Sequence, residues 1–481
     1  MYEHRRDAAD NEVIAAPIAF AKLPAQPHRA ALAELPENDT RTIMVAADLP
    51  TQSLLLNLGA MNHGTMCASV AAGHGFLGSR VEGVAPGAQL LPVHYRVPQS
   101  LEESEVPQIK ALLTLYRDAR VDLLTNSTIM SDTRKWTNER SLFYGQLLHR
   151  IHQRYPKLHF RGVANAGPAE EFFVEIAKAG GNLIGVGAYT PYETWKANFG
   201  IAPTLSHTPA PYSSFGPAYD GGLKPDLMAL AGTFSAQKPE WPGDLSSPYF
   251  EVPQGYGISG GTSAAGPHAA GHAALLISAA KQAGIPYDEA RLKMALFAST
   301  KFLDGVEARV QGRGLIQVDE AWQTLQKIKD HEPTQFVTEA PVRTPFSDQL
   351  VPAHVGRGLY ERIGWGPGET GHREITIKRI TGPADPVTYR LLWKGNDKGA
   401  FATTLREVRL PLNQPVKIPV RVAIGESGAY SAILDLVDTS LELIAHSVMF
   451  TIIAAEPLAA ENNYVATLTR KVPVQATELS M

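Results

Sequence analysis

The segment around Ser263 has the residue types that a nucleophilic serine needs. Gly257-Ile-Ser-Gly-Gly-Thr-Ser-Ala-Ala-Gly-Pro-His268 opens an apolar stretch with helical spacing, so Ser263 lies at the start of a predicted helix. There, free backbone N–H groups and the positive end of the helix dipole face a developing oxyanion. Gly260 and Gly261 let the backbone approach a substrate carbonyl, and Pro267 fits a first helical turn. The plainer interpretation is a Gly-Ser loop that leads into a buried helix, since short motifs also match by chance.

His63 is the candidate base for this serine. A serine hydroxyl is a poor nucleophile until a base removes its proton. Asn62-His-Gly-Thr-Met-Cys-Ala-Ser-Val-Ala-Ala-Gly73 places His63 at the start of a helix of small residues. A histidine in such a place is more often a helix-terminal or core residue than a base. Together, and in this order, the two segments predict a pair in which Ser263 is the nucleophile and His63 the base.

Alternating strands and helices are expected to position this pair, from about Thr40 to Gln326. Short apolar runs predict buried strands at Ala88–Tyr95, Val121–Leu124, Leu158–Val163 and Asn182–Gly187. Helical spacing predicts helices at Glu105–Arg120, Thr137–Tyr155 and Pro267–Ala283. This alternation is typical of an α/β fold, in which a parallel sheet is covered by helices on both faces.

Four segments are predicted along the chain. Residues 1–40 are expected to be an irregular leader, 41–330 the α/β domain, 331–353 a linker rich in Pro and Thr, and 354–481 an antiparallel β-sandwich. The sandwich is predicted from period-2 alternation in six runs: Glu374–Ile380, Thr388–Trp393, Glu407–Leu412, Val416–Ile424, Ala429–Val437 and Ile444–Ala454.

Composition excludes several classes of partner. The 481 residues carry a net charge of −4, from 44 basic and 48 acidic side chains, without a Lys/Arg cluster that would bind nucleic acid or an anionic membrane. The single cysteine, Cys67, allows no internal disulfide. The first residues have no apolar core typical of a secretory signal, and no run reaches the roughly 20 apolar residues of a membrane span. We therefore expect a cytoplasmic protein that binds neither membrane nor nucleic acid.

The two motifs resemble those of a known family. Asn62–Gly73 and Gly260–Gly271 are similar to the His and Ser motifs of the subtilisin superfamily of serine peptidases. Between them, Gly83–Ala88 resembles the family's GVAPxA turn, and Tyr212–Ala229 resembles its S-x-x-G-P and KPD stretch. Four landmarks in the family's order identify the fold as subtilisin-like.

Two later segments resemble one branch of that family. Gly312–Asp319 and Gly356–Tyr360 are similar to segments of the tripeptidyl peptidase II-like branch, in which a β-domain also follows the peptidase domain. The resemblance covers roughly residues 40–455. It implies a peptidase that acts on peptides or proteins, from the N-terminus or internally, and that assembles into larger complexes. We expect no cofactor. Subtilases often bind structural calcium, which the resemblance leaves possible here, but no His/Asp/Glu cluster has ligand spacing, so no metal site can be placed.

The resemblance also assigns a third site residue, Asn165. Val163-Ala-Asn-Ala-Gly-Pro168 resembles the AGNxGP segment that carries the family's oxyanion asparagine, with Ala164 in place of a glycine. A side-chain amide at this position can donate to the oxyanion beside the backbone N–H of Ser263. Otherwise Asn165 is an ordinary turn residue before Gly-Pro.

The family's aspartate is not evident. In a triad it holds the tautomer of the histidine and stabilises the imidazolium. No D-[ST]-G turn precedes His63, and Asp48, which ends the apolar run Ile43–Asp48, lies only 15 residues before it. In one interpretation Asp48 is the triad residue. In the other, which the spacing favours, residues 43–57 match the strand pair that directly precedes the His motif in the branch, and the aspartate comes from a missing segment or another chain.

A second departure concerns the substrate strand. Ser127 matches a family serine, but Ile129 and Met130 stand where small residues are expected, which narrows the cleft or marks its disuse. Cys67, one helical turn after His63, is interpreted as a buried core residue. The sequence thus leaves two functions open: a serine peptidase, or a catalytically impaired pseudopeptidase that binds peptides or a partner chain.

Overall fold

The computed structural model describes residues 63–75, 81–93, 105–127, 138–167, 182–200, 202–204, 206–236 and 255–456. It also gives the backbone of five short strands outside these ranges: β1 (Tyr2–Arg6), β2 (Glu12–Pro17), β3 (Ile43–Asp48), β4 (Ser53–Leu58) and β23 (Val474–Gln475). Strand β23 pairs with β8 (Ala202–Pro203).

A parallel sheet forms the centre of the first domain, as predicted. Its order is β10-β7-β6-β5, and β9 pairs antiparallel with the end of β7. Strand β6 is buried along nearly its whole length, as expected for a strand with helices on both faces. The strands are β5 (Leu123–Asn126), β6 (Leu158–Gly162), β7 (Ile184–Pro191), β9 (His207–Pro209) and β10 (Leu227–Leu230).

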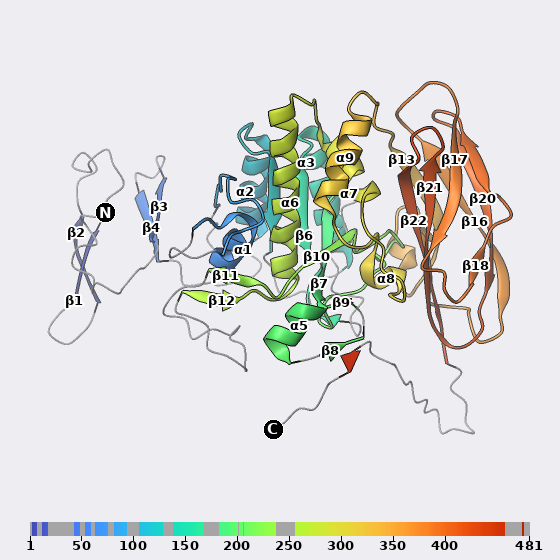
Figure 1. The fold of residues 1–481 in the computed structure, drawn as a ribbon, viewed down its shortest axis with the longest axis horizontal. Coiled ribbons are helices and arrows are strands. Elements are labelled where there is room, and N and C mark those ends of the chain that lie inside the picture. The colour runs from blue at the N-terminus through green and yellow to red at the C-terminus, as the bar shows by residue number, and fades with distance from the viewer. Residues whose placement is uncertain are drawn as a thin grey trace.

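Helices cover the two faces of this sheet and create two cores. On one face α6 (Thr262–Ala283) crosses the sheet, with α7 (Glu289–Ala298) and α9 (Val318–Ile328) beside it (Figure 1). On the other face α2 (Glu105–Arg117) and α3 (Asn138–Arg154) pack around Leu124 of β5. The remaining elements of the domain are α1 (His63–Ala72), α5 (Tyr192–Phe199), β11 (Phe234–Ala236), β12 (Tyr256–Ile258) and α8 (Ala308–Gln311).

The second domain is a β-sandwich, to the right of the helices in Figure 1. Its strands follow the order β18-β20-β16-β13-β15-β22-β21-β17-β19 and are antiparallel except that β15 runs parallel to β13 and β22. Six of its strands match the predicted runs: β16 (Thr370–Arg379), β17 (Val387–Lys394), β19 (Glu407–Leu410), β20 (Pro415–Ala423), β21 (Gly428–Asp438) and β22 (Leu443–Ala454).

The predicted linker at residues 331–353 is wrong. Strand β13 (Phe336–Arg343) lies within it and pairs with β14, β15 and β16. Its buried side chains, Thr338, Ala340 and Val342, follow the period of a strand, but Thr, Ala and Pro obscure that alternation in the sequence. The other elements of the domain are the short helix η7 (Ser347–Gln349) and the strands β14 (Val355–Gly356), β15 (Leu359–Glu361) and β18 (Phe401–Ala402).

Two further expectations need correction. Residues 1–40, expected to be irregular, contain the antiparallel pair of β1 and β2. The predicted strand at Ala88–Tyr95 is not a strand in its described part, residues 88–93, where Leu90 and Leu91 are 52% and 51% exposed. An apolar strand is buried only when neighbouring strands flank it, and β5 is the last strand of the sheet in the part that the structure describes.

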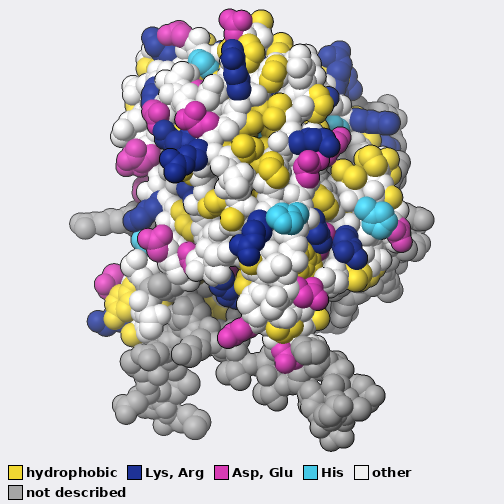
Figure 2. Space-filling model, turned by 90° about the vertical axis from the view of Figure 1, so that its right-hand side faces the viewer, with side chains coloured by type: hydrophobic (Ala, Val, Ile, Leu, Met, Phe, Trp, Pro, Cys, Tyr) yellow, Lys and Arg dark blue, Asp and Glu magenta, His cyan; other side chains and the backbone are white. Residues whose placement is uncertain are grey.

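The outer face of the β-sandwich end carries basic and acidic side chains in mixture with hydrophobic ones (Figure 2). On this face neither sign of charge dominates, which agrees with the near-neutral net charge. In the described ranges, no helix is long and apolar enough to cross a membrane.

Candidate active site

Ser263 is the second residue of helix α6, which begins at Thr262 and not at Pro267 as predicted, so Pro267 lies inside the helix and not in its first turn. The residue before the helix, Gly261, has φ 69°, a left-handed conformation that glycine adopts without steric cost. A Cβ at Gly261 would also lie 2.9 Å from Nδ2 of Asn165. The conformation therefore favours glycine here, and a side chain would push the Asn165 amide aside. Ser263 takes up the position at the helix N-terminus that favours negative charge.

The structure brings Asn165 to this helix N-terminus, as the prediction required. Its Oδ1 accepts a hydrogen bond from the backbone N–H of Thr262 at 2.7 Å and another from Thr262 Oγ1 at 3.1 Å. Because a backbone N–H can only donate, the amide must present its oxygen to Thr262. This side chain is exposed, and its Nδ2 has no acceptor among the described residues, so its hydrogens can donate to a ligand at the start of α6.

Thr262 is a site residue that sequence reasoning missed. It fixes the rotation of the Asn165 amide through both its backbone and its side chain. Its position directly before the nucleophile in the Gly-Thr-Ser motif was the available signal.

The loop that carries Asn165 is held in a strained conformation. Ala164 has φ 81°, which for a residue with a Cβ costs roughly 1–2 kcal/mol. Its carbonyl oxygen accepts from Ser214 N at 3.1 Å, and Ser214 Oγ accepts from Ala166 N at 3.0 Å. Gly167 N donates to Tyr212 O at 2.8 Å. Three hydrogen bonds to residues 212–214 thus hold the loop in shape.

His63 is the first residue of α1 and is partly buried. Burial lowers its pKa from the usual value, so the ring is neutral, the form of a base, at neutral pH. Its Nδ1 lies 3.9 Å from Cys67 Sγ, one turn along the same helix. Cys67 therefore occupies the side of the ring where a triad carboxylate is expected.

Cys67 and Ser127 join three elements at the nucleophile. Cys67 Sγ donates to the carbonyl oxygen of Ser263 at 3.4 Å, and Ser127 Oγ donates to the same oxygen at 2.9 Å. Burial raises the pKa of Cys67 to about 11, so its thiol is protonated and is not a competing nucleophile. The described contacts include no hydrogen bond between the side chains of Ser263 and His63, and Cys67 contacts the ring of His63 and the backbone carbonyl of Ser263. Such bonds are often absent before substrate binds.

The structure separates Asp48 from the parallel sheet. Asp48 is the last residue of β3, which pairs antiparallel with β4, and these two strands form a sheet of their own. This arrangement agrees with the interpretation of residues 43–57 as a strand pair before the His motif. The side chain of Asp48, and all of Ile129 and Met130, lie outside the described residues. Within those residues, no carboxylate forms an ion pair or hydrogen bond with His63.

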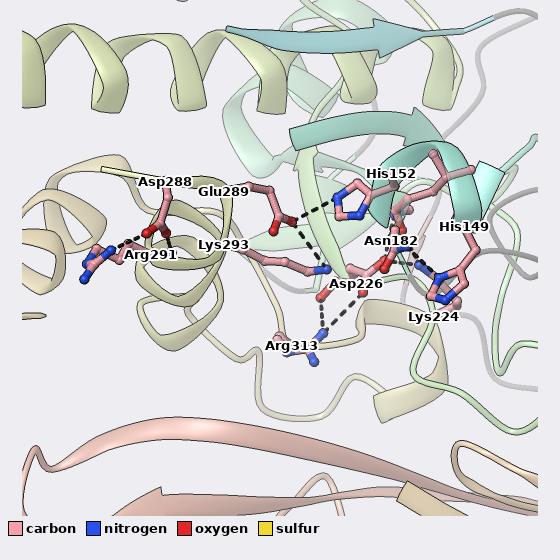
Figure 3. Close-up of polar contacts among 12 residues, drawn as sticks. His149, His152, Asn182, Lys224, Asp226, Asp288, Glu289, Arg291, Lys293 and Arg313 are labelled. Carbon is pink, nitrogen blue, oxygen red and sulfur yellow. Dashed lines mark hydrogen bonds and ion pairs between the residues drawn. The ribbon is translucent and has the colours of Figure 1, made fainter. Parts of the chain in front are cut away.

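The opposite edge of the sheet carries a cluster of buried charges (Figure 3). Asp226, directly before β10, pairs with Lys224 and accepts from Gly185 N at 2.7 Å, while Arg313 approaches it at 3.5 Å. Lys224 is 1% exposed and also donates to Leu183 O at 2.6 Å. Burial lowers the pKa of Lys224 to about 8 against the opposing effect of Asp226.

This cluster is structural and is separate from the candidate site. It lies where β7 and β10 begin, whereas Ser127 and Asn165 follow the ends of the parallel strands β5 and β6. Around it, His152 pairs with Glu289 at 3.4 Å, and Asn182 bonds to His149 at 2.8 Å (Figure 3). In the ranges that the structure covers, no three His, Cys, Asp or Glu side chains are grouped to hold a metal.

Comparison with protein families agrees with this geometry. The model of the subtilase family, peptidase S8, matches residues 52–314, more than half of the chain. The chain belongs to the subtilase family. A second model, of an Ig-like domain in actinomycete serine proteases, matches residues 337–454 of this subtilase. This match covers the β-sandwich, including most of β13.

Similar proteins place it near one branch of subtilases. Tripeptidyl-peptidase 2 of Drosophila melanogaster is 29% identical over 55% of the chain, and that of Arabidopsis thaliana is 29% identical over 63%. Pyrolysin of Pyrococcus furiosus is 26% identical over 53%. The chain spans only about a fifth of the length of these relatives, from 18% to 21%. A crystal structure of tripeptidyl peptidase 2 aligns with 88% of this chain and with 32% of its own. The TM-score of 0.61 at 22% identity shows a shared fold.

Proposed function

We propose that this subtilase hydrolyses peptide bonds with Ser263 as nucleophile and His63 as base. Ser263 Oγ attacks the carbonyl carbon while the His63 ring, whose Nδ1 lies against Cys67, accepts the proton at Nε2. The tetrahedral intermediate collapses as His63 returns the proton to the leaving amine. Water then hydrolyses the acyl-enzyme by the same route.

The orientation of Asn165 carries this proposal. Thr262 holds the amide oxygen, so the amide nitrogen is free to donate to an oxyanion beside the Ser263 N–H. Preorganised donors of this kind stabilise the charge that develops in acyl transfer. A protein that only binds peptides has no need for an amide donor that the residue before the nucleophile orients.

A fluorophosphonate probe, which phosphonylates an activated serine, tests the proposal. Between pH 6 and 9 we expect stoichiometric labelling that is lost in Ser263→Ala. Absence of labelling in the unsubstituted chain across this range would overturn the proposal and leave a pseudopeptidase that binds peptides.

The carboxylate that orients His63 comes, in this proposal, from outside the described residues. Its two candidate sources are Asp48 and a complementing chain. Without a third member, a triad keeps only the residual catalysis of the oxyanion hole and binding. Asp48→Asn distinguishes the sources, because slower labelling identifies Asp48, and unchanged labelling assigns the carboxylate to a complementing chain.

Substrate, assembly and location are also part of the proposal. The names of the tripeptidyl-peptidase relatives favour release of short peptides from a chain end, and the branch resemblance favours oligomers. A single cysteine suits a reducing, cytoplasmic location. Mass analysis of the products from a defined peptide tests the first point, since internal cuts would contradict it.

A further inference from the structure

The Asn165 loop is bonded to a segment, residues 212–222, that the β-sandwich contacts. Its three hydrogen bonds run to Tyr212 and Ser214, as described above. The chain continues from Ser214 directly into a turn at residues 218–222. In that turn Ala218 N donates to Gly222 O at 2.9 Å, and Gly222 N donates to Asp220 Oδ1 at 3.0 Å. The turn and residues 212–214, which hold the Asn165 loop, are therefore two ends of one short segment.

Arg357 of the β-sandwich holds this turn. Its Nε donates to Asp220 Oδ2 at 2.5 Å and its Nη2 to Asp220 Oδ1 at 3.2 Å, a fork that fixes the carboxylate in two places. The backbones also meet closely, because a Cβ on Gly358 would lie 2.0 Å from the carbonyl oxygen of Gly221. The Gly-Arg-Gly segment beside β15 thus fits tightly against the peptidase domain.

A second set of contacts holds the middle of the same segment. Arg309 of α8 accepts from Gly216 N at 2.8 Å through its carbonyl oxygen, and its guanidinium lies 5.4 Å from the ring centre of Phe215. Arg309 N donates to Ser431 Oγ of β21 at 3.2 Å. The β-sandwich therefore contacts the segment at the turn and, through α8, next to Phe215.

We propose that Asp220 and Arg357 are positioning residues, through which the β-sandwich keeps the Asn165 loop in its strained, donor-ready shape. The loop needs such support because Ala164 is held at a positive φ that the free chain avoids. Neither residue touches the reacting atoms. This inference rests on the proposed function only in assigning Asn165 to the oxyanion.

The test combines a rate with a measure of the loop itself. In Asp220→Asn, we expect the maximal rate of fluorophosphonate labelling to fall about tenfold with unchanged probe affinity, since a misplaced donor raises only the barrier. Arg357→Lys, which keeps the charge but loses the fork, should give a smaller loss. Glu442→Gln, which breaks the exposed Arg390–Glu442 pair within the sandwich, is the matched control. It should change neither the maximal labelling rate nor the probe affinity.

Two further measurements separate positioning from general damage. In an Asn165→Ala background, Asp220→Asn should cause no additional loss, because both act through the same donor. Additive losses would overturn the proposal.

Hydrogen exchange at Ala166 and Gly167, whose amides bond to residues 212–214, should also speed up in Asp220→Asn while the melting temperature stays within a few degrees. Unchanged exchange would refute the proposal even in a chain that no probe labels, whereas absent labelling alone counts against the proposed function.

Discussion

The two edges of the parallel sheet use polar groups in opposite ways. Where β7 and β10 begin, Lys224, Asp226 and Arg313 are buried and paired with one another. Where β5 and β6 end, the Asn165 amide is exposed, and among the described residues its nitrogen has no acceptor and His63 has no carboxylate partner. The charges where β7 and β10 begin are paired with one another and have a structural role. The groups where β5 and β6 end include a hydrogen-bond donor and a base that can act on a substrate. Substitutions at the first edge should therefore change folding, and those at the second should change chemistry.

The largest expected effect is at the buried edge. Asp226→Asn leaves Lys224 buried without its counter-charge, and breaking such a pair from one side costs about 3–5 kcal/mol of unfolding free energy. Urea unfolding followed by circular dichroism measures this loss. Asp122→Asn is the control, because the Asp122–Lys281 pair is about half exposed and should contribute at most about 1 kcal/mol. Equal losses in the two variants would contradict the structural role of the cluster.

The next effect belongs to the open edge. Asn165→Ala removes one oxyanion donor, and we expect labelling or turnover to fall by about 10²–10³, or roughly 2.7–4 kcal/mol in the barrier. Its unfolding free energy should change little, because the exposed amide bonds mainly to Thr262. Thr262→Val, which keeps the backbone hydrogen bond and loses the hydroxyl, should have a smaller effect on the rate. A large loss of stability with an unchanged rate would reverse the roles of the two edges.

Acid should also destabilise the buried part of the sheet, through His159. His159 in β6 is fully buried, and burial together with Arg161 lowers its pKa to about 3. In the unfolded chain His159 binds a proton near pH 6.5, whereas in the folded chain it stays neutral until about pH 3. Its contribution to the unfolding free energy is therefore fully present above pH 6.5. It falls by up to about 1.4 kcal/mol per pH unit as the pH drops toward 3. Unfolding curves at pH 7, 6 and 5 measure the slope, which should be shallower in His159→Gln.

The sequence predicted most of what periodicity and local motifs encode. The strands β6 and β7, the six long strands of the sandwich and the placement of Ser263, His63 and Asn165 near one another follow from apolar alternation and three short motifs. Strand β13 was missed because Thr, Ala and Pro hide its buried face. The exposure of Leu90 and Leu91 was missed because burial of a strand depends on neighbours that a local pattern does not show. The Asp220–Arg357 pair joins residues 137 positions apart, and no local signal connects them.

The smallest expected effect concerns Ala164, and it tests whether backbone strain in the Asn165 loop contributes to the site. Ala164→Gly places a glycine where φ is 81°, which relieves the clash of the Cβ. Against this, glycine adds freedom to the unfolded chain, so we expect a net gain in unfolding free energy of no more than about 1 kcal/mol. The same change at Ala166, whose φ is not positive, should instead lower the unfolding free energy. If Ala164→Gly is stabilised but labels more slowly, the strain contributes to the placement of Asn165. If it is stabilised and labels at the original rate, the hydrogen bonds to residues 212–214 suffice to position the donor.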